Sequence, residues 1–120
     1  MSRPLRTSER ALAAFFAGMG FLHFAAPRPF NRAVPPSTPM PARDATLISG
    51  AAEIAGGLGL LYPQTRGAAR LGLTALLIAV FPANIYMARY PERFGLRRSL
   101  LLARLPLQPL LIWQVLRVGR

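Results

Sequence analysis

The chain has no cysteine and no lysine, and its 120 residues include only four acidic side chains and one histidine. Without cysteine it forms no disulfide, offers no thiolate to a metal and performs no thiol redox chemistry of its own. A single histidine does not make a histidine-based metal centre, so we predict no metal site. The sequence also has no phosphate-binding glycine loop, no zinc-protease helix motif and no nucleophile elbow.

Charge and hydrophobicity occupy different parts of the chain. Hydrophobic residues make up 52% of it, yet its formal net charge is +11, and every basic residue is an arginine placed mainly between apolar runs. Arginines that flank long apolar runs are typical of a membrane protein, where they lie at the lipid interface. The arginines form no stripe interleaved with aromatic residues, so we expect anionic lipid, and no nucleic acid, as the partner.

Four apolar runs predict helices at about 8–26, 44–62, 71–88 and 99–117. The second and third connections are short, which makes neighbouring helices antiparallel. We therefore predict an all-α fold: a four-helix transmembrane bundle with up-down-up-down topology, forming a single membrane domain over residues 1–120. Equal numbers of arginines flank the two sides of this bundle, so the positive-inside rule leaves its orientation open.

The first connection, residues 27–43, is rich in proline. It holds six of the chain's 12 prolines, so we do not expect it to be helical throughout. Phe30, Val34 and Met40 are spaced along it and are able to press back onto the bundle. The sequence leaves two alternatives open, a solvated linker and a packed lid.

Each apolar run carries at least one polar group that lipid would reject. Counting about 1.5 Å per residue from the helix ends places these groups within roughly 14 Å of the same membrane face, on the side of the first and third connections. We predict that they form a polar intramembrane cluster, either structural or ligand-binding, made of His23, Glu53, Asn84, Arg104 and Gln108.

Glu53 is the most informative member of this cluster. A charged side chain near the bilayer centre costs about 2.5–3.5 kcal/mol on insertion scales, so it needs a partner, a proton or a function. Gly50 and Gly57 share its helix face, which predicts that Glu53 points into the bundle. Our first expectation is a static ion pair with Arg104, and the second is a proton-carrying or ligand-binding carboxylate.

The other members have simpler interpretations beside the functional one. His23 lies close enough to the interface for its ring to reach water, as amphipathic side chains near helix ends do. Asn84 and Gln108 are each explained by a hydrogen bond between helices.

Ordered motifs between about Gly18 and Ala88 closely resemble the DoxX-like family of small bacterial four-helix membrane proteins. They are His23-Phe24 with Pro27, Phe30 and Pro35; Ser49-Gly50 with Glu53; Pro63 with Arg66; and Phe81-Pro82-Ala83-Asn84. The resemblance implies a multi-pass protein of the bacterial cytoplasmic (inner) membrane. It further implies an accessory subunit of a quinone-linked redox system, with a quinone or a membrane oxidoreductase subunit as partner. It names no catalytic residue and no cofactor.

Two other functions fit the same residues. The first is a small proton-coupled transporter that uses Glu53 as an intramembrane carboxylate. The second is an enzyme acting on a quinone or isoprenoid, with His23 and Glu53 as acid and base.

Overall fold

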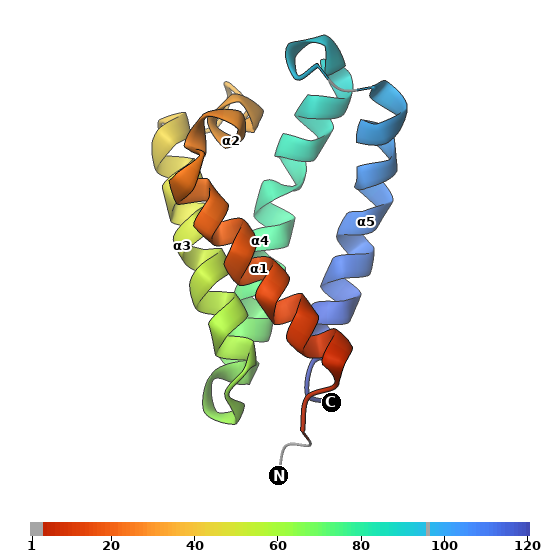
Figure 1. The fold of residues 1–120 in the computed structure, drawn as a ribbon. Helices are drawn as coiled ribbons and strands as arrows, with labels where there is room; N and C mark the ends of the chain where they lie inside the picture. The colour runs from red at the N-terminus through yellow and green to blue at the C-terminus, as the bar shows by residue number, and fades with distance from the viewer. Residues whose placement is uncertain (1–3, 96) are drawn as a thin grey trace.

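The computed structural model describes residues 4–95 and 97–120, and this part of the chain is entirely helical (Figure 1). The predicted all-α class is thereby confirmed, since no strand occurs among the described residues. Their five α-helices and one 3-10 helix are α1 (Thr7–Ala25), α2 (Pro27–Ala33), α3 (Ala42–Leu60), α4 (Pro63–Arg89), η1 (Pro91–Arg93) and α5 (Arg98–Arg117).

The four long helices run in alternating directions along the molecule (Figure 1). α1 packs on α3, α3 on α4, and α4 on α5. The beginning of α1, the turn between α3 and α4, and the end of α5 lie together at one end, which we call the terminus end. α2 and η1 lie at the opposite end, which we call the α2 end.

Proline positions explain where the structure departs from the predicted helix limits. α4 begins at Pro63, not at Leu71, and α3 has already ended at Leu60. Pro63 lies between the second and third predicted helices, and in the structure it occupies the first turn of α4. Proline suits this position because the first turn of a helix leaves its backbone N–H groups unpaired and because its fixed φ is already helical.

The same principle accounts for α2, which sequence reasoning did not predict as a helix. Pro27 and Pro29 lie in its first turn, where neither removes a hydrogen bond from the helix. α2 then packs against α3 and also contacts α1 and α4. The proline-rich connection therefore folds back onto the long helices over this part of its length, which corresponds to the packed alternative.

The buried apolar core lies towards the terminus end. It is built from the first half of α1, the last residue of α3, the first half of α4 and the end of α5 with the residue after it. Its fully buried members include Phe16, Leu60, Leu73, Val115 and Val118.

Glycine residues allow the backbones of α1 and α3 to approach each other closely. A Cβ atom added at Gly20 would lie 2.5 Å from the carbonyl oxygen of Gly50. A Cβ atom at Gly57 would lie 2.7 Å from the carbonyl oxygen of Ala13. These are backbone atoms, so a larger residue at either position would force the two helices apart. The prediction that the Glu53 face of α3 meets another helix agrees with this packing.

Buried polar contacts join the two ends of the described chain at the terminus end. The carboxylate of Glu9 accepts hydrogen bonds from the backbone N–H of Arg6 at 2.8 Å and from that of Gly119 at 2.9 Å. Arg70 of α4 donates to the carbonyl of Val118 at 2.7 Å. We call this set of contacts the terminal clasp. It satisfies an amide at the start of α1 that the helix leaves unpaired, and it holds the residues after α5 against α1 and α4.

The turn between α3 and α4 is fixed by side chains of the first turn of α4. Thr65 Oγ1 donates to the carbonyl of Gly59 at 2.8 Å. Arg66 is 4% exposed, and its Nε donates to the carbonyl of Leu60 at 2.8 Å. Carbonyls at the end of α3, which have no partner within the helix, are thus satisfied by residues that follow the turn.

Two of the described helices, α4 and α5, are long and apolar enough by length and composition to cross a membrane. α1 and α3 are not, although the sequence predicted four spans. α3 contains three charged residues, Arg43, Asp44 and Glu53, which make it less apolar. α1 begins with polar residues and has His23 near its end.

Candidate functional site

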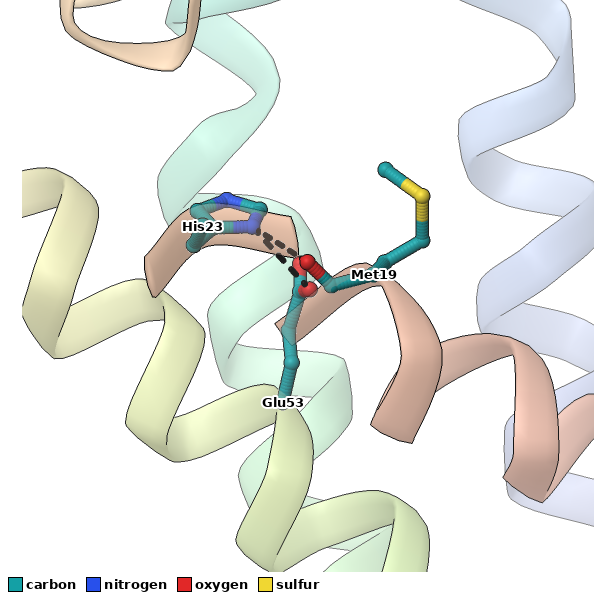
Figure 2. A network of polar contacts seen from close by, with 3 residues as sticks. All are labelled: Met19, His23 and Glu53. Carbon is teal, nitrogen blue, oxygen red and sulfur yellow. Dashed lines mark hydrogen bonds and ion pairs between the residues drawn. The ribbon is translucent and has the colours of Figure 1, made fainter. Parts of the chain in front are cut away.

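One member of the predicted polar cluster on α1 meets one on α3. His23 lies in the last turn of α1 and Glu53 in the middle of α3, and their side chains point towards each other between the helices (Figure 2). His23 Nδ1 is 3.7 Å from Glu53 Oε2, and the two side chains are only 10% and 14% exposed. Gly50 makes room for this pair, because a Cβ atom there would lie 2.6 Å from His23 Cβ.

A backbone carbonyl determines how the imidazole is oriented. His23 Nδ1 lies 2.6 Å from the carbonyl oxygen of Met19, one turn earlier in α1 (Figure 2). A carbonyl only accepts, so Nδ1 must carry the hydrogen of this bond. In a neutral imidazole Nε2 is then the acceptor. The Nδ1 hydrogen is used in the bond to the Met19 carbonyl, so it is not free to be donated to Glu53.

This arrangement leaves one carboxylate oxygen without a hydrogen bond. Glu53 Oε2 is buried and has no hydrogen-bond partner, and its contact with His23 at 3.7 Å is too long to be one. A buried acceptor without a donor is costly, and a proton or a ligand hydroxyl would remove that cost. The site can therefore accept a hydrogen bond from a ligand at Glu53 Oε2, and a neutral His23 can accept another at Nε2.

α2 covers the site with an aromatic ring. The ring of Phe30 stacks on the imidazole of His23, with the ring centroids 3.8 Å apart and the planes inclined by 19°. The pair thus lies below α2, between α1 and α3. The sequence left open whether Phe30 packs on the long helices, and the structure shows that it packs on the one histidine of the chain.

The predicted ion pair between Glu53 and Arg104 is wrong. Arg104 is exposed on α5, where its Nη1 lies 3.9 Å from the sulfur of Met87, and Glu53 contacts His23 instead. The physical reason is the arrangement of the helices side by side. α5 packs mainly on α4, whereas the side chain of Glu53 extends from α3 towards α1. Counting residues gives a height along the bundle, but it does not give the neighbour of a helix.

The remaining members of the predicted cluster are not joined to the pair by any hydrogen bond or ion pair in the described chain. Asn84 is half-buried on α4. Gln108 is buried on α5, and its Oε1 has no hydrogen-bond partner. His23 and Glu53 are two potential metal ligands, and no third histidine or carboxylate joins them among residues 4–95 and 97–120. The five predicted residues therefore reduce to one connected pair.

Sequence reasoning missed a second polar group at the α2 end. Tyr86 and Tyr90 are four residues apart at the end of α4, and Arg89 and Arg93 are also four residues apart. The four side chains line a cavity beside the proline-rich segment 35–37. The signal that would have found the group is the repeat of both residue types at a spacing of one helical turn.

A comparison with known protein families identifies the family to which the chain belongs. Residues 12–119 match the family described as "Domain of unknown function (DUF8561)". The chain belongs to the DUF8561 family. No curated protein and no solved structure matches it. The match begins within α1 and covers the other described helices, so the His23–Glu53 pair and the cavity lie inside the DUF8561 domain, whereas Glu9 of the terminal clasp precedes it.

Proposed function

We propose that this DUF8561 protein is a multi-pass protein of the bacterial cytoplasmic membrane in which α1, α3, α4 and α5 form an up-down-up-down transmembrane bundle. The length and apolar composition of α4 and α5, which are sufficient for a helix to cross a membrane, support this proposal. So does the outer surface of all four helices, which exposes large apolar side chains that water would disfavour and lipid would cover. Examples from each helix in turn are Phe15, Phe21, Ile48, Leu58, Leu71, Ile78, Leu107 and Trp113.

Within that membrane we assign the protein an accessory, non-catalytic role in a quinone-linked redox system, in keeping with its resemblance to the DoxX-like family. The observation that carries the assignment is the buried, unpaired Oε2 of Glu53 beside the imidazole of His23. A hydroquinone head group is a flat ring with two hydroxyl groups. One hydroxyl can donate to Glu53, and the ring can lie against aromatic side chains such as Phe30. The proposed role is to bind this head group, and no chemical step is assigned to the chain.

The test compares Glu53→Gln with Glu92→Gln. Both variants replace a glutamate by its neutral isostere, but Glu92 lies exposed in η1, away from the pair. Each protein is purified from bacterial membranes, and the bound quinone is extracted and measured per mole of protein. A hydrogen bond to a charged group is worth about 1.5–3 kcal/mol, so we expect Glu53→Gln to lower quinone affinity by roughly 10- to 100-fold.

The same preparations separate binding from folding. If Glu53→Gln accumulates normally in membranes and loses quinone while Glu92→Gln retains it, the proposed role is supported. If wild-type protein carries no quinone, or if both variants carry it equally, the assignment of the pair to quinone is wrong. Recovery of the wild-type protein in the soluble fraction would contradict the membrane location itself.

The His23–Glu53 pair also supports a second function, a small proton-coupled transporter. Two titratable groups in contact between α1 and α3 provide a place where a proton can be held inside the bundle. In proteoliposomes with an imposed pH gradient, a transporter would show proton flux that Glu53→Gln abolishes and Glu92→Gln preserves. An accessory subunit would show no flux above that of empty liposomes.

A further inference from the structure

The end of α4 and the proline-rich segment line an open cavity of about 510 Å³ at the α2 end. One wall is the last part of α4 with the residue that follows it, from Pro82 to Tyr90, and the other is the segment 35–37. Arg93 of η1 completes the lining. This volume is in the range of small-molecule binding sites, which are concave and combine apolar walls with a few placed polar groups.

The cationic side chains of the cavity are held in place by its tyrosines. Arg93 Nη1 donates to the hydroxyl of Tyr86 at 2.7 Å, and its guanidinium carbon lies 4.6 Å from the centre of the Tyr90 ring. The guanidinium of Arg89 lies 5.9 Å from the same ring. Contacts of this kind are cation–π interactions, and they orient both guanidinium groups at the cavity without neutralising them.

No carboxylate of the described residues forms an ion pair with either of these two guanidinium groups. Glu92 is the nearest acidic residue in sequence, and within the described chain it forms no ion pair with Arg89 or Arg93. The carboxyl end of α4 supplies a partial negative charge equivalent to about half an electron, which is smaller than the two positive charges present. The cavity therefore carries a net positive charge that an anion would complement.

The rest of the lining is apolar and indicates what kind of anion fits. Pro82 and Ile85 continue the wall along α4 away from the arginines, and Ile85 is exposed. If α4 spans the membrane as proposed, the arginines at its end lie in the head-group region on that side, and Ile85 lies at the level of the acyl chains. A ligand that matches both ends has a phosphate and a hydrocarbon tail.

We propose that this cavity binds the phosphate head group of an anionic phospholipid. The phosphate lies against Arg89 and Arg93, whose guanidinium groups match phosphate oxygens in geometry and charge. The acyl chains run along Pro82 and Ile85. The proposal rests on the membrane location given above, but not on the quinone assignment, because the cavity and the His23–Glu53 pair have no residue in common.

The test uses delipidated protein in neutral detergent and measures lipid binding by native mass spectrometry. The probes are phosphatidylglycerol, phosphatidylcholine with identical acyl chains, and inorganic phosphate. An arginine near an anionic lipid surface contributes about 5-fold in affinity, so Arg89→Gln with Arg93→Gln should weaken phosphatidylglycerol binding by about 30-fold. The matched control is Arg97→Gln with Arg98→Gln, which removes the same charge at the beginning of α5, outside the cavity. We expect less than about a 2-fold change in the control.

Each outcome decides the proposal. Equal losses in the two double variants would mean diffuse surface charge and would overturn it. If phosphatidylcholine binds as tightly as phosphatidylglycerol, the cavity does not require a ligand with net negative charge. If millimolar inorganic phosphate displaces phosphatidylglycerol, the cavity is a site for a free anion and not for a lipid. Both results would also overturn it.

A second variant keeps the test valid if the double variant fails to fold. Tyr86→Phe retains the ring but removes the hydroxyl that accepts from Arg93, and Tyr62→Phe makes the same change at the exposed turn between α3 and α4. We expect weaker phosphatidylglycerol binding in Tyr86→Phe alone. Membrane location is read separately, from carbonate-resistant fractionation of cells, so failure of the lipid site is distinguishable from failure of the membrane assignment.

Discussion

A single methyl group placed on Gly57 would meet the backbone of α1. A Cβ atom there would lie 2.7 Å from the carbonyl oxygen of Ala13 and 2.8 Å from the amide nitrogen of Ala17. Ordinary van der Waals contacts of a Cβ atom begin at 3.4 Å. Neither backbone atom is able to rotate away, so Gly57→Ala must move α3 from α1 by about 0.7 Å at this point.

The expected cost follows from that displacement. Overpacking a close interface typically costs about 1–3 kcal/mol, whereas replacing glycine by alanine within a helix contributes about 0.5–1 kcal/mol in the opposite direction. We expect Gly57→Ala to destabilise the protein by about 1–2 kcal/mol. Gly18→Ala, on the outer side of α1, meets no atom within 4 Å and should leave stability unchanged or raise it by up to about 1 kcal/mol.

The measurement is the free energy of unfolding in mixed detergent micelles, followed by far-ultraviolet circular dichroism with increasing denaturing detergent. The quantity of interest is the difference between the two alanine variants, because both gain the same helix propensity. If Gly57→Ala is as stable as Gly18→Ala, the close approach of α1 and α3 is refuted.

Three further predictions concern contacts at the two ends of the molecule. Glu9→Gln leaves the hydrogen bonds to Arg6 and Gly119 without a charged acceptor and should destabilise the protein by about 1–3 kcal/mol, measured by the same unfolding assay. Arg66→Lys loses the planar guanidinium that donates to the carbonyls of Leu60 and Leu61, so we expect the free energy of unfolding to fall by about 1–3 kcal/mol. Arg10→Lys, at an exposed position of α1, is the control and should leave the free energy of unfolding unchanged. Phe30→Ala removes the stack on His23, worth about 0.5–1.5 kcal/mol, and should make tryptic cleavage after Arg32 roughly 2- to 10-fold faster. Phe21→Ala, at a residue 64% exposed on α1, should leave that rate unaltered.

Apolar run length predicted the long helices well, because a helix that buries or exposes a continuous apolar surface leaves that signal in the sequence. The limits set by proline were predicted less well. The predicted helices 8–26 and 44–62 end just before Pro27 and Pro63, whereas each of these prolines begins a further helix. The chemistry of proline differs between the first turn and the interior of a helix, and the sequence around these residues did not show which of the two applied.

At the candidate site too, features that depend on neighbouring residues in the sequence were predicted, whereas features that depend on the arrangement of the helices were not. The small residues beside Glu53 predicted correctly that this face of α3 meets a neighbouring helix, since only close packing requires glycine there. Which helix that neighbour is depends on how the helices are arranged laterally, and no local pattern records this. Glu53 was therefore assigned to Arg104 at a suitable depth, when its contact is His23.

The terminal clasp has a consequence for how the protein assembles. The hydrogen bond between Glu9 and Gly119 joins residues 110 positions apart. Closing so long a segment of flexible chain carries a large entropic cost, which falls only when the helices between its ends are already packed. Formation of this contact is thus expected late on the folding pathway, after α1, α3 and α4 have met. A probe pair at these two positions would report the completion of folding and not its onset.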